Sequence, residues 1–487
     1  MTGASGRLWP VVVAVQLGVL LTAIEATVVG TAIPTLIAAL GGARLYPWVF
    51  AAYMLASTVA MPVFGGLSDR LGRKGPYLFA VTVFSVGALV AGAAPSMPVL
   101  ILGRVVQGAG GGGVLSLSLI IFGDLFAGPR RGQMQGLITA VWGVASLVGP
   151  VLGGVIVDHW SWRWVFFLNP PLGVVLVALA AWALRETVPP GGGRGLDLPG
   201  VATFVVGATA LLLAVIGPGG TEPGVGMGRG AAALLGLLAL ATFVQLEARA
   251  PDPLLPLSLF GERLFTVGAI VGFLSSAAMF GALVHVPILV QWGQGTDATT
   301  AGLTLVTMST SWSVGALLAG QVMHRTGFGA LVAAGMTVMT AGFLGLALRP
   351  DASWQLLLWI GAVTGLGMGL VSITLVVAVQ TLADVGRRGM ATAGLLFFRN
   401  VGGTLGVAVM GGVLSARLGI GLAELGAQPG AVPPGLAARL APEMGRVWWV
   451  GVAAAAVGLA ATFALPPRSW RPSPAPRRAE GVEELVS

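Results

Sequence analysis

The sequence predicts an all-α polytopic membrane protein with about fourteen transmembrane helices, arranged as two pseudo-symmetric six-helix bundles plus two accessory helices. Three observations predict this fold class. Hydrophobic residues make up 56% of the 487-residue chain and charged residues only 9%, whereas a soluble domain is about 25% charged. Apolar runs of about 20 residues, the length that spans a hydrocarbon core, recur along the chain. The second half of the chain also repeats motifs of the first.

The rest of the composition disfavours several other classes of protein. The chain has no Cys, which excludes disulfides, thiolate metal sites and cysteine nucleophiles. The net charge is +8, but the arginines lie in short loops and not along one tract, so nucleic acid is not expected as a partner. With three His residues, no H-E-x-x-H and no nucleophile elbow, we expect neither an enzyme nor a cofactor or metal site.

The predicted spans follow the apolar runs in order. The first run contains Glu25 and is long enough to cross a membrane, so we interpret it as a retained helix and not as a signal peptide. Arginines concentrate in alternate loops, and the positive-inside rule then places both termini in the cytoplasm, with the protein in the cytoplasmic (inner) membrane. The predicted spans are 11–37, 47–67, 76–95, 98–123, 135–157, 165–184, 198–217, 230–247, 264–290, 300–323, 329–348, 354–381, 391–414 and 447–465.

An internal repeat divides the chain into domains. Gly65 and Gly72 match Gly320 and Gly327, which lie 255 residues further on. The two copies account for two bundles, and the surplus spans lie between them. We therefore predict an N-terminal six-helix bundle at 1–190, linkers and two accessory transmembrane helices at 191–256, a C-terminal six-helix bundle at 257–468 and a disordered cytoplasmic tail at 469–487.

One ten-residue stretch between two apolar runs concentrates charge and glycine. A loop this short joins antiparallel helices, and its glycines permit φ > 0 and close helix approach. It resembles the loop between the second and third helices of the major facilitator superfamily, G-x-x-x-D-R-x-G-R-[KR], at every fixed position. The resemblance implies a gating loop, and the alternative is a solvated charge run that only sets the topology. The matching residues are Gly65, Asp69, Arg70, Gly72, Arg73 and Lys74.

Glu25 in the first span is the candidate for proton coupling. It is a carboxylate at mid-membrane, where an acid costs about 2.5–3.5 kcal/mol on insertion scales, and such a position usually indicates function. The surrounding stretch is similar to the L-D-x-T-V-V-N-V-A-L-P motif of the fourteen-helix drug:proton antiporter branch of that superfamily, with Glu25 in place of Asp and Gly30 in place of Asn. The resemblance implies that Glu25 takes up and releases protons. The alternative is a carboxylate that an arginine neutralises for structural reasons.

That arginine is expected to be Arg104, which begins an R-x-x-Q-G motif with Gln107 and Gly108. The motif resembles one in the fourth helix of the same superfamily. A buried guanidinium needs a partner. The resemblance implies that Arg104 tunes proton affinity or contacts substrate, and a structural clamp between helices is the alternative.

The predicted fifth span carries a G-P-x-x-G-G motif that resembles one found in the antiporters of the superfamily. Proline removes a helical hydrogen bond and the glycines relax the backbone beside it, so a kink is expected. The resemblance favours export over uptake, and simple bundle packing is the alternative. The motif residues are Gly149, Pro150, Gly153 and Gly154.

Several polar and aromatic residues inside predicted spans are candidates for the wall of a central cavity. For the aromatic residues ordinary packing is the alternative, for His285 a packing role in place of a proton relay, and for Arg399 snorkelling. These candidates are Tyr53, Gln107, Trp142, Phe280, His285, Trp312, Phe397, Arg399 and Asn400.

The residues and the resemblance together predict a monomeric antiporter. It would use a proton gradient to export amphipathic, often cationic small molecules by alternating access, with protons, substrate and membrane lipids as its partners. The alternatives are an exporter of a lipid or an endogenous metabolite on the same fold, and a membrane sensor that does not transport.

Overall fold

The structure is a computed structural model that describes residues 5–40, 45, 47–126, 129–186, 198–216, 228–250, 253, 257–296, 298–382, 387–418 and 434–463. In that part of the chain every regular element is helical. The all-α prediction is therefore confirmed. The predicted tail at 469–487 and the predicted boundaries at 190 and 256 lie outside the described residues, so the division into domains stays a prediction.

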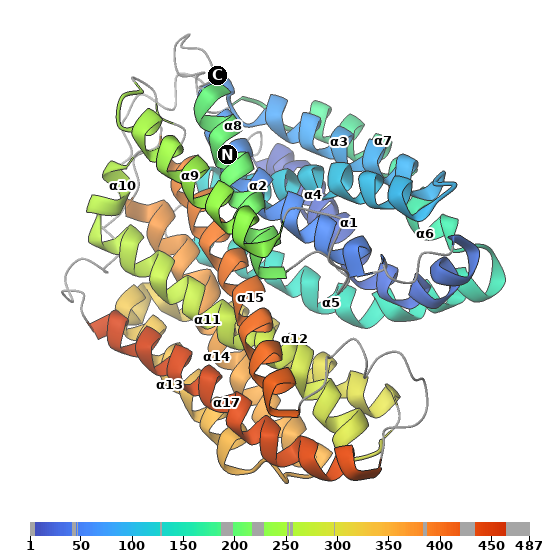
Figure 1. The fold of residues 1–487 in the computed structure, drawn as a ribbon. Coiled ribbons are helices and arrows are strands. Elements are labelled where there is room, and N and C mark those ends of the chain that lie inside the picture. Colours follow the sequence, from blue (N-terminus) through green and yellow to red (C-terminus); the bar gives the residue numbers. More distant parts are fainter. Residues whose placement is uncertain are drawn as a thin grey trace.

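The N-terminal helices form one group, drawn in blue to cyan in Figure 1. Glycines allow its helices to approach closely. Gly108 and Gly112 of one helix lie directly against the backbone of Tyr53 and Ser57 of another, where a Cβ atom would not fit. The helices of this group are α1 (Ser5–Leu40), α2 (Pro47–Leu71), α3 (Lys74–Gly92), α4 (Met97–Leu125), α5 (Pro129–His159), α6 (Arg163–Phe167) and α7 (Asn169–Ala183).

The C-terminal helices form a second group, drawn in yellow-green to red in Figure 1. The repeat predicted from the sequence is visible in the backbone: Gly72 after α2 has φ +85° and Gly327 after the corresponding helix has φ +84°, a conformation that favours glycine. The helices of this group are α11 (Arg263–Ile288), the π-helical turn η1 (Leu289–Gly293), α12 (Ala298–Thr326), α13 (Phe328–Leu348), α14 (Trp354–Leu382), α15 (Arg388–Leu418) and α17 (Pro434–Phe463).

Two helices between the groups occupy the predicted accessory positions. They are α8 (Leu198–Ile216) and α9 (Arg229–Glu247), followed by the short α10 (Ser258–Gly261). α8 packs against α9, α2 and α15, so the pair covers the place where the two groups meet along α2 and α15 (Figure 1).

Among the described residues, twelve helices are long and apolar enough to cross a membrane. The sequence predicts about fourteen spans, two more than these twelve. The two further long helices are α5, which packs between α1 and α12, and α8, whose apolar segment Leu198–Leu211 is shorter.

The two groups touch on one side of the molecule. Gly132 of α5 lies against Gly320 of α12, and Ser313 of α12 donates a hydrogen bond to the carbonyl of Thr139, at 3.0 Å. Across the other seam, Gly65 of α2 lies against Ala393 of α15. These contacts fall in the last halves of α2 and α12 and the first halves of α5 and α15, which is the side of the Asp69 loop.

Candidate functional site: two buried charge clusters

Glu25 and Arg104 form an ion pair inside the N-terminal group. Arg104 Nη1 lies 2.5 Å from Glu25 Oε1, and the two side chains are 0% and 1% exposed. The second carboxylate oxygen, Oε2, accepts a hydrogen bond from Asn169 Nδ2 at 2.5 Å. Helices α1, α4 and α7 thus meet at one carboxylate, which satisfies the rule that a buried charge needs a partner.

The arginine of this pair is held on several sides. Its Nε donates to the carbonyl of Val49 at 2.9 Å and its Nη1 to Gln107 Oε1 at 2.7 Å. The guanidinium lies over the ring of Tyr53, 4.4 Å from the centroid, a cation–π contact. Two predicted cavity residues, Tyr53 and Gln107, therefore belong to the Glu25 cluster.

A small cavity of about 150 Å³ adjoins Glu25 between α1 and α7. Its polar lining among the described residues consists of Glu25 and Asn169, and the rest is apolar. Leu172 and Val175 on its wall are more than half exposed at the surface of the group. The carboxylate is therefore reached from this side only across apolar surface.

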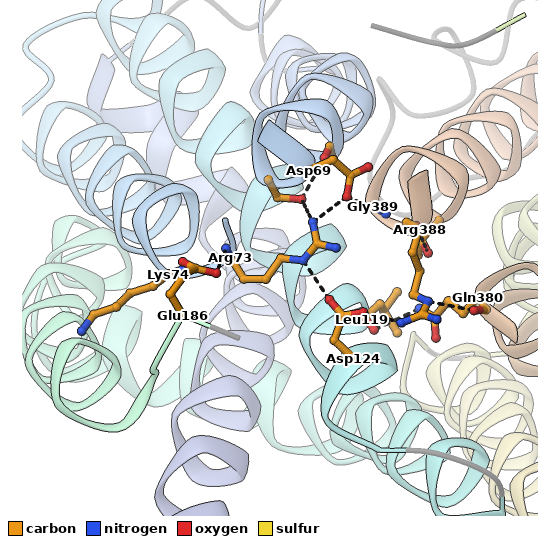
Figure 2. Close-up of polar contacts among 12 residues, drawn as sticks. Asp69, Arg73, Lys74, Leu119, Asp124, Glu186, Gln380, Arg388 and Gly389 are labelled. Atoms are coloured by element: carbon orange, nitrogen blue, oxygen red, sulfur yellow. Dashed lines mark hydrogen bonds and ion pairs between the residues drawn. The ribbon is translucent and has the colours of Figure 1, made fainter. Parts of the chain in front are cut away.

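The second cluster joins the two groups of helices at the predicted gating loop (Figure 2). Asp69, near the end of α2, accepts hydrogen bonds from the backbone N–H groups of Gly389 (3.0 Å) and Met390 (2.8 Å). These N–H groups belong to the first turn of α15, where the helix dipole favours an anion. One carboxylate thus links the first group to the second.

Arg73 connects this contact to a second carboxylate. Its Nη1 lies 2.6 Å from Asp69 Oδ1 and its Nε lies 2.8 Å from Asp124 Oδ2. The residue is 2% exposed. Burial by itself lowers the pKa of the Arg73 guanidinium, but Asp69 and Asp124 more than offset this, so its pKa lies above the ordinary value. Arg73 therefore stays charged throughout the physiological range.

Asp124 in turn crosses to the C-terminal group. Its Oδ1 lies 2.7 Å from Nη1 of Arg388, and Arg388 also donates to the carbonyl of Gln380 at 2.8 Å. Beneath them the buried amides of Gln135 and Gln380 are 2.9 Å apart, and both donate to the carbonyl of Leu119. On the side of the molecule that carries Asp69, the two groups are thus joined by polar contacts of Asp69, Asp124 and the two glutamines.

Glu186, just after α7, binds the backbone of the loop that carries Arg73 and Lys74. Its carboxylate accepts the backbone N–H groups of Arg73 (2.8 Å) and Lys74 (3.1 Å) at the start of α3. It occupies the space that a Cβ on Gly72 would need, so Gly72 is required both for its positive φ and for this contact. Lys74 Nζ reaches the carbonyl of Ala181 at 2.6 Å, which ties the loop to α7.

The comparison with known proteins identifies the fold family. A model described as Major Facilitator Superfamily matches residues 15–407. The chain belongs to this superfamily. It is accordingly a multi-pass membrane transporter and not an enzyme.

Curated relatives in the superfamily include multidrug transporters. The multidrug transporter protein MdtP of Bacillus subtilis (strain 168) is 37% identical over 404 residues, which are 82% of this chain and 74% of the relative. Multidrug resistance protein 3 of the same organism is 32% identical over 404 residues, 83% of this chain and 79% of the relative. The MFS-type transporter Rv1877 of Mycobacterium tuberculosis (strain ATCC 25618 / H37Rv) is 35% identical over 432 residues, and the match covers 86% of this chain but 61% of that relative.

Solved structures show the same superfamily fold. The human organic anion transporter MFSD10 aligns with a TM-score of 0.64 and 16% identity, over 92% of this chain and 99% of its own. The proton:xylose symporter XylE aligns with a TM-score of 0.68 and 14% identity, over 99% of this chain and 100% of its own. At such identities the likeness concerns the fold alone.

The remaining predicted site residues of this transporter lie mostly in its C-terminal group. The rings of Phe280 and Trp312 are edge to face at 6.1 Å. Asn400 Nδ2 lies 3.6 Å from the sulfur of Met61 on α2, at the seam between the groups. His285 is 1% exposed, with its Nδ1 2.8 Å from the carbonyl of Gly281.

Two predicted cavity residues have other surroundings. Phe397 packs against Phe204 of α8, with ring centroids 5.2 Å apart, so its contact is with an accessory helix. Trp142 is partly buried against the hydrophobic core.

Arg70, a residue of the predicted gating loop that follows Asp69 directly, is partly buried.

The predicted antiporter motif lies in the middle of α5. The helix runs unbroken from Pro129 to His159, and Gly149 and Gly153 are buried. The surroundings of Pro150 and Gly154 fall outside the described residues, so the expected kink stays a prediction.

Several residues of the two clusters were not predicted from the sequence. Asn169 lies in a W-R-W…N-P-P stretch of the sequence, and its only signal there is an amide placed before two prolines. Glu186 and the pair Gln135 and Gln380 carry no motif in the sequence. Their roles depend on helices that meet only in the folded chain.

Proposed function

We propose that the protein is a proton-coupled antiporter that exports amphipathic small molecules by alternating access. The observation that carries the proposal is the buried Glu25 carboxylate, held by Arg104 and Asn169 at the meeting of three helices. A carboxylate that far from water can alternate between a charged and a neutral form, and each change of charge alters its attraction for Arg104. The multidrug relatives support small-molecule export.

The Asp69 cluster supplies the second part of the proposed cycle. It holds the two helix groups together on one side, and its ion pairs and helix-end contact must break for that side to open. Rocking of one bundle against the other around a central site is the general scheme for transporters built from repeats. The structure then corresponds to the state that is closed on the Asp69 side.

The proposal places the Asp69 side in the cytoplasm and both termini there as well, in the cytoplasmic membrane. It is supported by the arginines of the Asp69 side, because cationic loops stay inside. Since the chain has no Cys, a cysteine introduced at Ser161 should react with an impermeant maleimide in intact cells, and one at Ser487 only after lysis. The opposite pattern would invert the assignment.

Transport in proteoliposomes tests the coupling directly. With inside-out orientation and an acidic lumen, uptake of an amphipathic dye should rise several-fold over vesicles without a gradient, and nigericin should abolish the increase. If uptake requires the protein but does not depend on the pH gradient, the protein is a transporter without proton coupling. Empty vesicles and vesicles with unfolded protein serve as controls.

A second candidate is export of a lipid or a lipid-like metabolite. The apolar cavity between α1 and α7, with its exposed wall residues Leu172 and Val175, is the observation that favours it. In the same vesicles, translocation of a fluorescent lipid in place of dye would support this candidate.

A further inference from the structure

Arg399 on α15 is a cation inside the membrane, and no described residue is its hydrogen-bond or ion-pair partner. It lies about 16 Å along the helix from the first residue of α15, close to the middle of a hydrocarbon core of about 30 Å. It is only partly exposed, its Nε is buried with no hydrogen-bond partner, and no carboxylate pairs with it among the described residues. Arginines that snorkel lie near helix ends, whereas Arg399 does not.

The sequence offers no acid to neutralise it nearby. Helices α11, α12, α13, α14 and α15 contain no Asp and no Glu. The mid-membrane acid of the other bundle, Glu25, is already paired with Arg104. Among the described charges at mid-membrane, Arg399 is therefore left uncompensated, and a buried charge without a partner is strongly unfavourable.

The neighbours of Arg399 line the seam between α11 and α15. Its side-chain stem lies over Gly272 of α11, and one turn further along α11 is Ser276, whose fully buried hydroxyl also lacks a partner. The next turn carries Phe280, which packs on Gly403, one turn beyond Arg399 on α15. A cation, a hydroxyl and an aromatic ring thus follow one another along the seam between α11 and α15.

This row of side chains continues onto two more helices, α12 and α14. Phe280 is edge to face with Trp312 of α12, and Trp312 Nε1 donates to Ser372 Oγ of α14 at 3.1 Å. Aromatic rings with a polar edge bind flat apolar groups and still satisfy their own donors. Two elements of ligand recognition are therefore adjacent, a fixed positive charge and an aromatic wall.

From this arrangement we infer that Arg399 is the binding site for a negatively charged group, a carboxylate or sulfonate, on an amphipathic substrate whose apolar body packs on Phe280 and Trp312. The inference rests on the proposed export function and names its substrate class. It differs from the sequence-based expectation of often cationic substrates, because Glu25 is engaged by Arg104, whereas no described residue pairs with Arg399. Guanidinium groups are suited to this role, because their fork of donors matches a carboxylate.

The test compares three ligands that differ only in charge: 1-pyrenebutyrate, 1-pyrenebutanol and 1-pyrenebutylammonium. Binding to the full chain in nanodiscs is measured by equilibrium dialysis, with empty nanodiscs subtracted. The butyrate should bind at least about 10-fold more tightly than the other two, as expected for a hydrogen-bonded charge. This measurement uses no pH gradient, so it can succeed or fail independently of proton-coupled transport.

Variants then locate the site. Arg399→Gln should lower butyrate affinity by about 10- to 100-fold and change butanol binding less than about 2-fold, while Arg399→Lys should keep part of the preference. The matched control is Arg349→Gln, at an exposed arginine just after α13, which should change nothing. Equal binding of all three ligands by the wild type, or an equal loss for all three in Arg399→Gln, would overturn the inference.

The unfolding temperature distinguishes a binding role of Arg399 from a structural role. Because no described residue pairs with Arg399, Arg399→Gln should not lower the unfolding temperature, and saturating butyrate should raise that of the wild type only. If Arg399→Gln unfolds at a clearly lower temperature than the wild type, Arg399 is a structural residue and the inference fails.

Discussion

Replacing Glu25 with glutamine is expected to abolish transport driven by a pH gradient while exchange of substrate across vesicles without a gradient persists. Glutamine has nearly the shape of a protonated glutamate and cannot gain or lose the proton. It can still accept from Arg104 Nη1, which lies 2.5 Å from Glu25 Oε1 in the wild type. The measurement is dye uptake into proteoliposomes with and without an imposed gradient.

Three variants separate coupling from folding in this experiment. Breaking one side of a buried ion pair costs about 3–5 kcal/mol, so Glu25→Gln could fail through instability. The double variant Glu25→Gln with Arg104→Gln removes both charges and should recover unfolding temperature without recovering coupling. Glu25→Asp keeps the carboxylate and should retain part of the gradient-driven uptake, and Asp351→Asn, an exposed carboxylate, should behave as wild type. Full coupling in a folded Glu25→Gln protein would move the proton site elsewhere.

The sequence was sufficient to predict the class of fold and the centres of both clusters. Apolar length predicts membrane helices directly, and a charged residue in an apolar run stands out because it is costly there. This is why Glu25, Arg104 and the Asp69 loop stand out in the sequence alone. The pairing of Glu25 with Arg104 can also be predicted from the sequence, since each buried charge needs an opposite one.

The partners of these residues could not be predicted in the same way. Asn169 lies 144 residues from Glu25 along the chain, and Gly389 lies 320 residues from Asp69. Gly389 contributes a backbone N–H, which no sequence pattern marks. Phe397 shows the same limit, because an accessory helix occupies the space that a cavity was expected to fill.

The two halves of the transporter also differ more than their repeated loops suggest. Gly72 and Gly327 share one backbone conformation, but His324 stands where the first copy has Asp69. The matching seam between α5 and α12 closes through glycine backbones, with Gly132 against Gly320 and no carboxylate among the described contacts. The Asp69 contact with α15 therefore provides a charge-dependent latch at one seam, whereas the other seam depends on close packing.

That asymmetry leads to the expected result for Asp69→Asn, a transporter that folds but exports at least about 10-fold more slowly. The variant weakens three charge-assisted contacts, with Arg73 Nη1 and the N–H groups of Gly389 and Met390. Hydrogen bonds to charged groups contribute about 1.5–3 kcal/mol each, so the Asp69 side should open more often. Transport slows because the state closed on that side becomes less populated.

Cysteine accessibility can show whether this opening is the cause. Ala393 lies against Gly65 at the same seam and is fully buried, and the native chain has no thiol to interfere. In the Ala393→Cys background, Asp69→Asn should raise the rate of labelling by a small methanethiosulfonate reagent by about the same factor as it raises the population that is open on the Asp69 side. Ser68→Ala is the matched control, because Ser68 Oγ accepts from Arg73 within the same helix group at 2.9 Å and touches no residue of α15 by hydrogen bond. It should leave labelling unchanged, and if Asp69→Asn also leaves it unchanged while transport falls, Asp69 acts on a step other than closure.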